Sequence, residues 1–177
     1  MTCLNLKGYS RGCDESVGGI KTVVLFETAD VSSYTIDASG NLSTLTLKDD
    51  GNAFKYEFLR DNANFTDAII GAGTVSSISF QPSINLTFKR ANTLLINEII
   101  ELGKNYTSAV IETNNGDHFT LGIERGLGLL ASPGITSGNN FEEANGAVLL
   151  LQGTERRPII PTDITAAGID SKIKTLF

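Results

Sequence analysis

The side chains that could carry out catalysis are few and are scattered along the chain. His118 is the only histidine, so a Ser-His-Asp or Cys-His arrangement would have to use it as the general base. It follows the turn-forming residues 114–117 (NNGD), where a solvated residue at the start of a strand is the expected role. No Gly-x-Ser-x-Gly segment is present to place a nucleophile on a strand-to-helix turn.

Two pairs of neighbouring acids, Asp49-Asp50 and Glu142-Glu143, are the other candidates for acid-base chemistry. Glycoside hydrolysis requires two carboxyl groups that converge from separate elements onto one bond. Both pairs instead lie in turn or loop sequence, where adjacent acids are usually solvated. We therefore predict no catalytic residue and no enzymatic activity.

Cofactor and metal sites are not indicated either. Cys3 and Cys13 are the only cysteines, and neither forms a Cys-x-x-Cys pair or lies near His118, so we predict no metal-ligating residue. Two reduced thiols are favoured over a disulfide that would pin the N-terminal residues. The glycine-rich residues 122–128 (GIERGLG) lack the Lys-Ser/Thr of a P-loop and the helix of a dinucleotide site, so we interpret these glycines as strand bends and predict no cofactor.

Charge and aromatic content argue against two kinds of binding protein. The 14 Lys and Arg residues against 20 Asp and Glu residues give a net charge of -6, which disfavours binding to nucleic acid through its phosphates. Trp is absent, so an aromatic sugar-binding site would depend on Tyr34, Tyr56 and Tyr106, for which core or half-buried strand positions are expected. Four Asn-x-Ser/Thr matches are interpreted as chance products of a β protein rich in Asn and Thr: Asn41, Asn64, Asn85 and Asn105.

No segment predicts membrane insertion. The longest apolar runs, 23–26 and 147–151, are far too short to span a bilayer, and no apolar signal segment follows Met1. We therefore expect a protein that is made in a cytosol and has no membrane partner.

The element predicted most clearly is a helix from Asn92 to Gly103. The Asn side chain can accept from the free N–H groups of the first turn, and the Gly suits a left-handed C′ position. Leu94 is the one apolar residue outside an arc of about 160° that predicts a buried face. The residues in that arc are Leu95, Ile96, Ile99, Ile100 and Leu102.

Strands are predicted on both sides of this helix. Residues 77–89 alternate apolar and polar side chains without a break, so one face is expected to meet a core and the other water or a neighbour. Pro82 cannot donate to a ladder and therefore marks an edge, a bulge or a bend. Residues 109–113 and 119–124 flank the NNGD turn and predict a hairpin.

Strand patterns also cover much of the remaining chain. The continuous apolar run 23–26 predicts a strand buried on both faces, and 147–152 predicts a buried closing strand. Turn residues at 37–41 and 49–52 predict a meander of hairpins from residue 34 to residue 60, and 64–70 predicts one more strand. The expected fold is mainly β, of the α+β type: one domain, 1–177, built as a β-sandwich or barrel with one flanking α-helix.

Three segments without a periodic pattern are expected to lie outside this core. They are an N-terminal arm at 1–21, a long loop at 132–146 rich in Gly, Ser and Asn, and an extended C-terminal arm at 156–177 with two prolines. Arms that cannot be buried within one domain can be buried on neighbouring copies. Together with the acidic balance and the lack of a catalytic motif, they favour an assembly subunit over an enzyme.

Several short segments carry a resemblance to a known family. They are GYSRGCD (8–14) and GGIK (18–21) near the start, LTFKR (86–90), ETNNG (112–116), LGIERG (121–126) and QGTERRP (152–158). In these segments the chain resembles tail tube-like structural proteins of tailed phages that infect Bacteroidota. The tail after Pro158 is longer than this resemblance predicts, and residues 32–74 contain no matching motif.

The resemblance implies a β-sandwich or barrel with a flanking helix, assembled as stacked hexameric rings around a channel for genome ejection. The sheet would pair across subunits, and the arms and the long loop would join one ring to the next. The implied partners are copies of the same chain, other phage tail proteins and DNA in transient, non-specific passage. The implied location is the tail of the virion, after synthesis in the host bacterial cytoplasm.

Two physical features agree with a conduit for DNA. A wall with excess carboxylates repels phosphates, and the polar face of 77–89 is a candidate for the wet lumen. The alternatives are a neck or terminator component of the same fold and a non-catalytic carbohydrate- or receptor-binding β-sandwich module. An enzyme is the third possibility and would require an activity that depends on His118 or on Glu142-Glu143.

Overall fold

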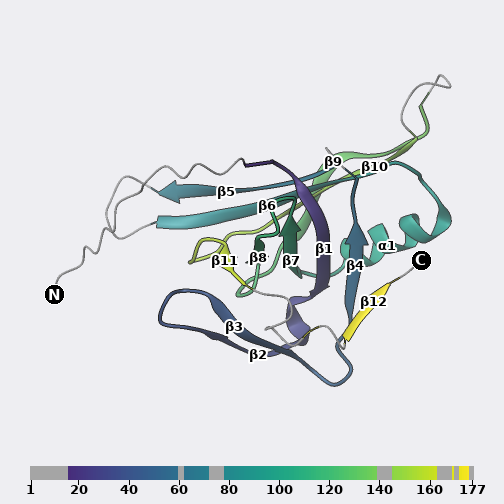
Figure 1. Cartoon of the computed structure of the whole chain (residues 1–177). Coiled ribbons are helices and arrows are strands. Elements are labelled where there is room, and N and C mark those ends of the chain that lie inside the picture. Colours follow the sequence, from purple (N-terminus) through teal and green to yellow (C-terminus); the bar gives the residue numbers. More distant parts are fainter. Residues whose placement is uncertain are drawn as a thin grey trace.

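The fold is mainly β with one flanking α-helix, as the sequence predicts. The computed structural model describes residues 16–59, 62–71, 78–138, 145–162, 169 and 172–175. Within this part of the chain, the helix α1 (Thr93–Leu102) and a short 3₁₀-helix (Thr28–Asp30) accompany the strands (Figure 1). The strands are β1 (Ile20–Glu27), β2 (Val31–Ile36), β3 (Leu42–Leu47), β4 (Ala53–Glu57), β5 (Ala63–Gly71), β6 (Ile78–Phe88), β7 (Thr107–Thr113), β8 (His118–Leu121), β9 (Gly128–Thr136), β10 (Gly146–Gln152), β11 (Ile160–Pro161) and β12 (Ile173–Thr175).

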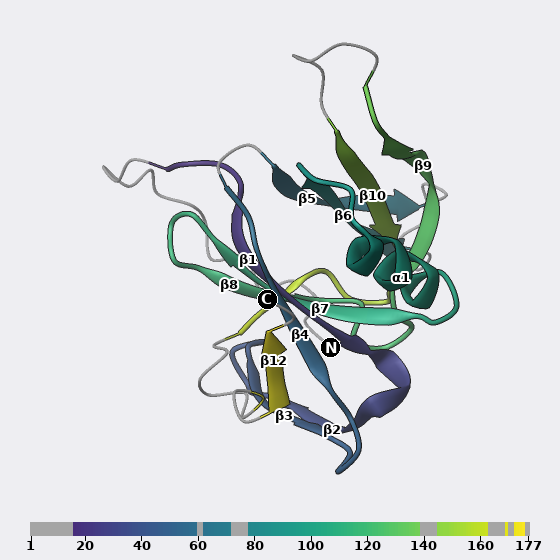
Figure 2. The ribbon, with the colours of Figure 1, turned by 90° about the vertical axis from the view of Figure 1, so that its right-hand side faces the viewer.

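These strands form three layers. A six-stranded sheet in the order β11-β8-β7-β1-β4-β12 lies between a four-stranded sheet, β5-β6-β10-β9, and the β2-β3 hairpin (Figure 2). The alternation in β1 shows why the middle sheet is covered twice: Val23 and Leu25 belong to one apolar cluster, while Val24 and Phe26 belong to the other. The prediction that 23–26 is buried on both faces is therefore confirmed.

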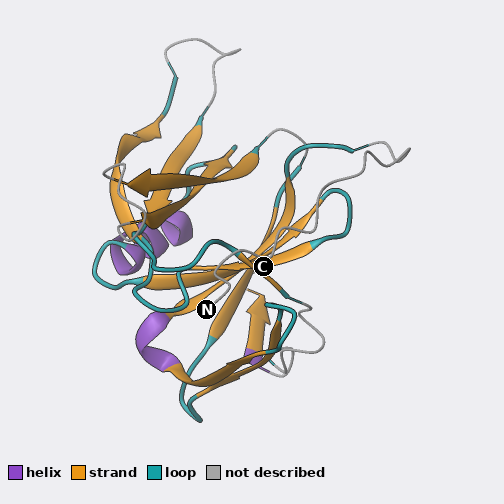
Figure 3. Cartoon of the chain, turned by 90° about the vertical axis from the view of Figure 1, so that its left-hand side faces the viewer, coloured by secondary structure: helices purple, strands orange, loops and turns teal. Residues whose placement is uncertain are grey.

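Each apolar cluster joins the middle sheet to one outer layer. The cluster toward the four-stranded sheet includes Ile84 and Leu86 of β6 and Leu149 and Leu151 of β10, and Leu102 of α1 joins it. The cluster toward the hairpin is formed by Val24, Phe26, Leu42, Leu45, Leu47, Ala53, Val110, Ile123, Ile160 and Ile169. The helix lies at one end of the layers and does not cover a whole face (Figure 3).

The helix starts as predicted but ends differently. The Asn92 side chain accepts a hydrogen bond from the backbone N–H of Leu95 at 2.8 Å. Gly103 has φ -75°, which is right-handed and not the predicted left-handed conformation, because its N–H still bonds to the Ile99 carbonyl and the helical turn continues. The predicted buried face is only partly covered: Ile96 and Ile100 are 41% and 50% exposed.

The alternation predicted for 77–89 is confirmed in β6, where Ile84 and Leu86 are fully buried. The strand is not at an edge, however, because it lies between β5 and β10. Pro82 lies one residue beyond the last β6-β10 pair, Ser83 with Gln152, and its carbonyl accepts from Gly153. Backbone pairing continues beyond it between Phe80 and Glu155, so the missing N–H of Pro82 interrupts the ladder at one position only.

The turns at 37–41 and 114–117 form the predicted hairpins. Gly116 has φ 87°, which a residue with a Cβ rarely adopts, and its N–H bonds to the Thr113 carbonyl. The predicted meander from 34 to 60 is wrong in one respect: β4 pairs with β1 and not with β3. The reason is that β3 buries Leu45 and Leu47 against the middle sheet, so the β2-β3 hairpin forms a separate layer.

The predicted long loop at 132–146 is wrong at both ends. β9 continues to Thr136 and β10 begins at Gly146, and these two residues pair with each other. A run rich in Gly and Ser normally indicates a loop, but β9 has a strand on one side only, and such an edge position tolerates Pro133 and the positive φ of Gly134 (71°). The prediction at 139–144 lies outside the described residues.

The two predicted arms are partly docked on the domain itself. Residues 1–15 lie outside the described part of the chain, but Ile20, inside the predicted arm, is a fully buried residue of β1. In the C-terminal arm, β11 pairs with β8 and β12 pairs in parallel with β4. Ile160 and Ile169 are buried in the cluster under the hairpin, which explains why this arm stays on its own domain.

Candidate assembly surface

The four-stranded sheet has an inner face on the core and an outer face without a described charge. The register places Asn64 opposite Asn85, and Asn85 opposite Leu150, all on the side away from the buried Ile84 and Leu86. The outward side chains are hydroxyls, amides and aliphatic groups, and no charged side chain occurs among those described on this face. They are Asn64, Thr66, Ala68 and Ile70 of β5; Ser79, Gln81, Ser83, Asn85 and Thr87 of β6; Leu130 of β9; and Val148, Leu150 and Gln152 of β10.

Both edges of this sheet are open in the described part of the chain. The order β5-β6-β10-β9 leaves one side of β5 and one side of β9 without a paired strand, and each of these strands has 9 residues. Such edges present backbone N–H and C=O groups to another chain. Three antiparallel pairings separate β5 from β9, so the two edges run in opposite directions. Copies related by rotation about an axis along the strands can therefore add edge to edge as antiparallel neighbours.

The hydrogen-bond direction in β5 shows which backbone groups are available. Thr87 of β6 donates to the carbonyl of Asn62, so alternate residues in step with this pair, such as Thr66, direct their backbone toward β6. The residues between them, including Asp67, direct their N–H and C=O groups away from the sheet. These outward groups are the ones that a neighbouring strand would use.

Two acidic residues, Asp67 through its carboxylate and Glu155 through its backbone, connect the outer sheet to the segment that follows β10. Asp67 accepts from the backbone N–H of Ile159 through Oδ2 at 2.9 Å. Glu155 is 5% exposed, exchanges two backbone hydrogen bonds with Phe80, and accepts from the N–H of Arg125 at 2.9 Å. Burial raises the pKa of the Glu155 carboxyl, and backbone N–H groups of residues 124–126 offset part of that rise. The Asp67 and Glu155 carboxylates both accept from backbone N–H groups of other segments, so we assign them a structural role.

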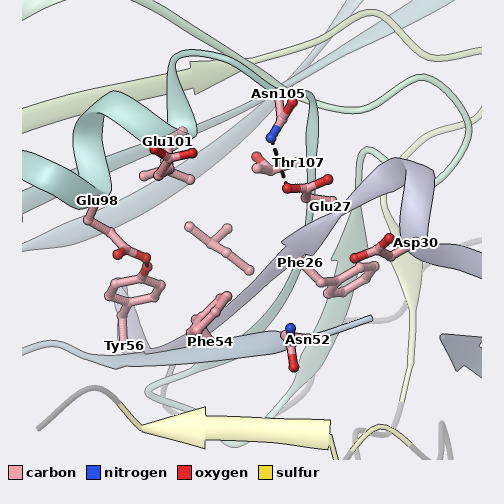
Figure 4. A pocket seen from close by; sticks show the side chains of 12 residues that line it. Phe26, Glu27, Asp30, Asn52, Phe54, Tyr56, Glu98, Glu101, Asn105 and Thr107 are labelled. Carbon is pink, nitrogen blue, oxygen red and sulfur yellow. Dashed lines mark hydrogen bonds between the residues drawn. The ribbon is translucent and has the colours of Figure 1, made fainter. Parts of the chain in front are cut away.

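The most acidic hollow lies between α1 and the strands β1 and β4, with a volume of about 110 Å³ (Figure 4). Its carboxylates are partly engaged: the Tyr56 hydroxyl donates to Glu98, and the Asn105 amide donates to Glu27 at 2.8 Å. Burial, with the Glu98 carboxylate beside it, raises the pKa of Tyr56 well above its usual range. No histidine, serine or cysteine lines the hollow, and the hydroxyl of Thr107, which does line it, donates to the Leu127 carbonyl and not to a carboxylate.

The catalytic candidates are not brought together. His118 begins β8 opposite Glu112, and no Ser, Thr or Cys side chain among the described residues hydrogen-bonds to its imidazole. Asp49 and Asp50 are exposed in the turn after β3. Glu142-Glu143 and both cysteines lie outside the described residues.

The binding candidates are dispersed as well. Tyr34, Tyr56 and Tyr106 line different hollows, so they do not form one aromatic platform. Gly122 and Gly126 have φ 70° and 80° and lie in a series of bends, as predicted, and the space beside Gly126 is filled by Thr28 and Tyr106. No group of three or more His, Cys, Asp or Glu side chains suited to a metal ion occurs in the described ranges.

The comparisons with known proteins identify no relative. No family model matches the chain, and neither a curated protein nor a solved structure is similar to it. Among the described helices, none has the length and apolar character needed to cross a membrane.

The open sheet edges were missed by sequence reasoning because strand order is set by contacts between distant segments. One signal pointed to the unusual nature of this sheet: no charged residue occurs from Ala68 to Phe88. Exposed strands of a monomer normally carry charges that prevent association.

Proposed function

We propose that this chain is a structural subunit of a phage tail, which forms stacked rings that make the tail tube. The observation that carries the proposal is the β5-β6-β10-β9 sheet, which has two open antiparallel edges and an uncharged outer face. The resemblance of the short motifs supplies the biological setting. The subunit has no catalytic activity, and its partners are copies of itself, other tail proteins and the DNA that passes through.

Edge-to-edge addition of this sheet would make a closed barrel. Six copies with four strands each would form a 24-stranded barrel. With strands spaced at 4.8 Å and tilted by about 40°, its backbone diameter would be about 48 Å. Barrels of 16–18 strands already leave an aqueous channel, so such a ring leaves room for a duplex.

The chemistry of the outer face suits a lumen wall. A DNA conduit must not bind phosphates, and the described outer face offers no lysine or arginine to do so. The expected excess of carboxylates is absent from this face, so sliding would rely on neutral hydroxyl and amide groups. The acidic net charge of -6 then acts on the outside of the ring and favours solubility.

A neck or terminator component of the same fold is the second candidate. The β2-β3 layer favours it, because this layer lies in residues 32–74, where the resemblance has no matching motif. A terminator would close one ring and would not stack further, so the number of rings in the assembly separates the two roles.

A matched pair of variants tests the edge pairing. Asp67→Pro removes an N–H that points away from β6 and so blocks a neighbouring strand, while Asp67→Ala removes the same carboxylate but keeps that N–H. We expect ring-sized particles in mass photometry for Asp67→Ala and monomers for Asp67→Pro, with equal far-UV circular dichroism. Rings of equal yield from both variants would contradict the proposed edge pairing.

A further inference from the structure

The β5-β6 hairpin extends beyond the layers that cover the rest of its sheet. Pairing with β10 ends at Ser83, and the segment after β10 makes its last backbone hydrogen bonds to β6 at Phe80, yet β5 and β6 remain paired to Gly71 and Ile78 (Figure 1). At this end Ile69 and Ile78 are 71% and 55% exposed, and Phe80 is half-buried beside them. The register places these three side chains, named here the hairpin tip, on the same face as the buried Ile84. The row of apolar side chains on the core-facing side of the sheet therefore extends beyond the core.

The sequence around the hairpin tip lacks the usual protection of an exposed strand. Charged residues on edge strands and at loop tips normally prevent association with other chains. From Ala68 to Phe88 the chain has no charged residue. Exposed isoleucines in an uncharged segment indicate a surface that another protein covers.

A complementary apolar hollow lies at the other end of β6. Phe88, the last residue of that strand, lines it together with Tyr56 and with Leu94 and Leu95 of α1. Polar side chains surround these apolar ones: Lys89, Arg90, Asn92, Asn97 and Glu98. This hollow, named here the helix cleft, has a volume of about 410 Å³, which is within the range of binding pockets for small apolar groups. Leu94 is 51% exposed, and an apolar occupant of the helix cleft would explain why it departs from the buried face of the helix.

We infer that the hairpin tip of one copy docks in the helix cleft of a second copy of this chain. The hairpin tip lies at the start of β6 and the helix cleft lies beyond its end, so a single translation along β6 brings them together (Figure 1). β6 has 11 residues, which sets that translation at about 37 Å. Because the two copies are related by a translation along β6 and not by a rotation that closes, this contact between two different surfaces propagates as an open stack.

This inference rests on the proposed function and adds to it the contact between rings. The resemblance assigns that contact to the arms and the long loop, whereas the geometry points to the β5-β6 hairpin and α1. Edge pairing around the ring and tip-in-cleft docking along the axis use different residues. The two kinds of contact can therefore fail separately.

Cysteine cross-linking tests the docking in the full-length chain. In a background with Cys3→Ser and Cys13→Ser, single variants Ile78→Cys and Leu94→Cys are mixed and treated with a short bis-maleimide. Because each variant then has a single cysteine, a product of twice the subunit mass reports contact between copies. Ser33→Cys, on the exposed face of β2, mixed with Leu94→Cys is the matched control.

Charge substitution supplies the second measurement. Ile69→Asp and Ile78→Asp place a carboxylate in an apolar contact, and we expect the concentration needed for stacking to rise by roughly tenfold or more. Ser79→Asp adds the same charge to the opposite face of the hairpin, and Leu94→Asp adds it to the helix cleft. Stacking should fail with Leu94→Asp as it does with the two isoleucine variants, and persist with Ser79→Asp.

The outcomes separate this inference from the proposed function. Selective cross-linking of positions 78 and 94, with single rings from Ile78→Asp, supports both. Rings that stack without this cross-link overturn the docking and leave the ring proposal standing. Cross-linked linear chains without rings support the docking and contradict the ring proposal, and monomers without cross-links overturn both.

Discussion

The β2-β3 and β5-β6 hairpins use the same alternating pattern but treat their apolar sides differently. In β2-β3, Leu42, Leu45 and Leu47 are all buried against the middle sheet. In β5-β6, the stripe begins as buried residues at Ala63 and Ile84 and ends as exposed ones at Ile69 and Ile78. The difference lies in what covers the strand, because the first hairpin is shorter than the layer below it and the second is longer.

The residues that connect the two strands of each hairpin also differ in charge. The β2-β3 turn is closed by the Asp37 carboxylate, which accepts from the N–H groups of Ser39 and Asn41 at 2.8 and 2.9 Å. Such a charged turn is suited to water. The turn of the hairpin that hides its apolar side thus contains a charge, whereas residues 72–77 (AGTVSS), which connect β5 to β6, contain none. We interpret this contrast as support for the proposal that the hairpin tip contacts another copy of the chain.

The largest expected effect separates the covered and uncovered halves of β6. Ile84→Ala removes fully buried methyl groups and should lower the free energy of unfolding by about 2–5 kcal/mol. Ile78→Ala should change it by less than about 0.5 kcal/mol, because that residue is 55% exposed in the single subunit. Urea unfolding at concentrations below assembly measures both values. Equal losses would show that the tip is covered by its own chain.

A smaller, pH-dependent effect tests how the base of the projecting hairpin is held. Glu155 is the buried acid whose backbone pairs with Phe80, and its raised pKa means that the folded state keeps the proton to a higher pH than the unfolded chain. The contribution of Glu155 to stability should therefore fall as pH rises above about 4.5, by at most about 1.4 kcal/mol per pH unit for one proton. Glu155→Gln keeps an acceptor for Arg125 and should lose this slope. Thermal unfolding of both proteins from pH 4 to pH 7 provides the measurement, and parallel pH profiles would exclude the account.

Local chemistry explains which parts of this fold were predictable. The Asn92 cap, the turn at Gly116 and the alternation around Ile84 depend on residues close in sequence, and all three were predicted. The pairing of β4 with β1, the extension of β9 to Thr136 and the open edges depend on distant segments. A pattern of period two specifies which side chains share a face but not whether a layer covers that face.

The candidate surface was predicted only in part for the same reason. The polar face of 77–89 was proposed as a lumen wall from its alternation together with the resemblance, and the structure adds that its neighbours on β5 and β10 are also uncharged. The exposure of Leu94, Ile96 and Ile100 could not be predicted, because the helical period gives the apolar arc without the size of the surface beneath it.

The most direct test of the account is electron microscopy of the purified full-length protein at rising concentration. We expect rings with a central hole that stack into tubes, with adjacent rings separated by about 37 Å or less once strand tilt is included. Particles of single-subunit size at every concentration, or compact oligomers without a channel, would contradict it.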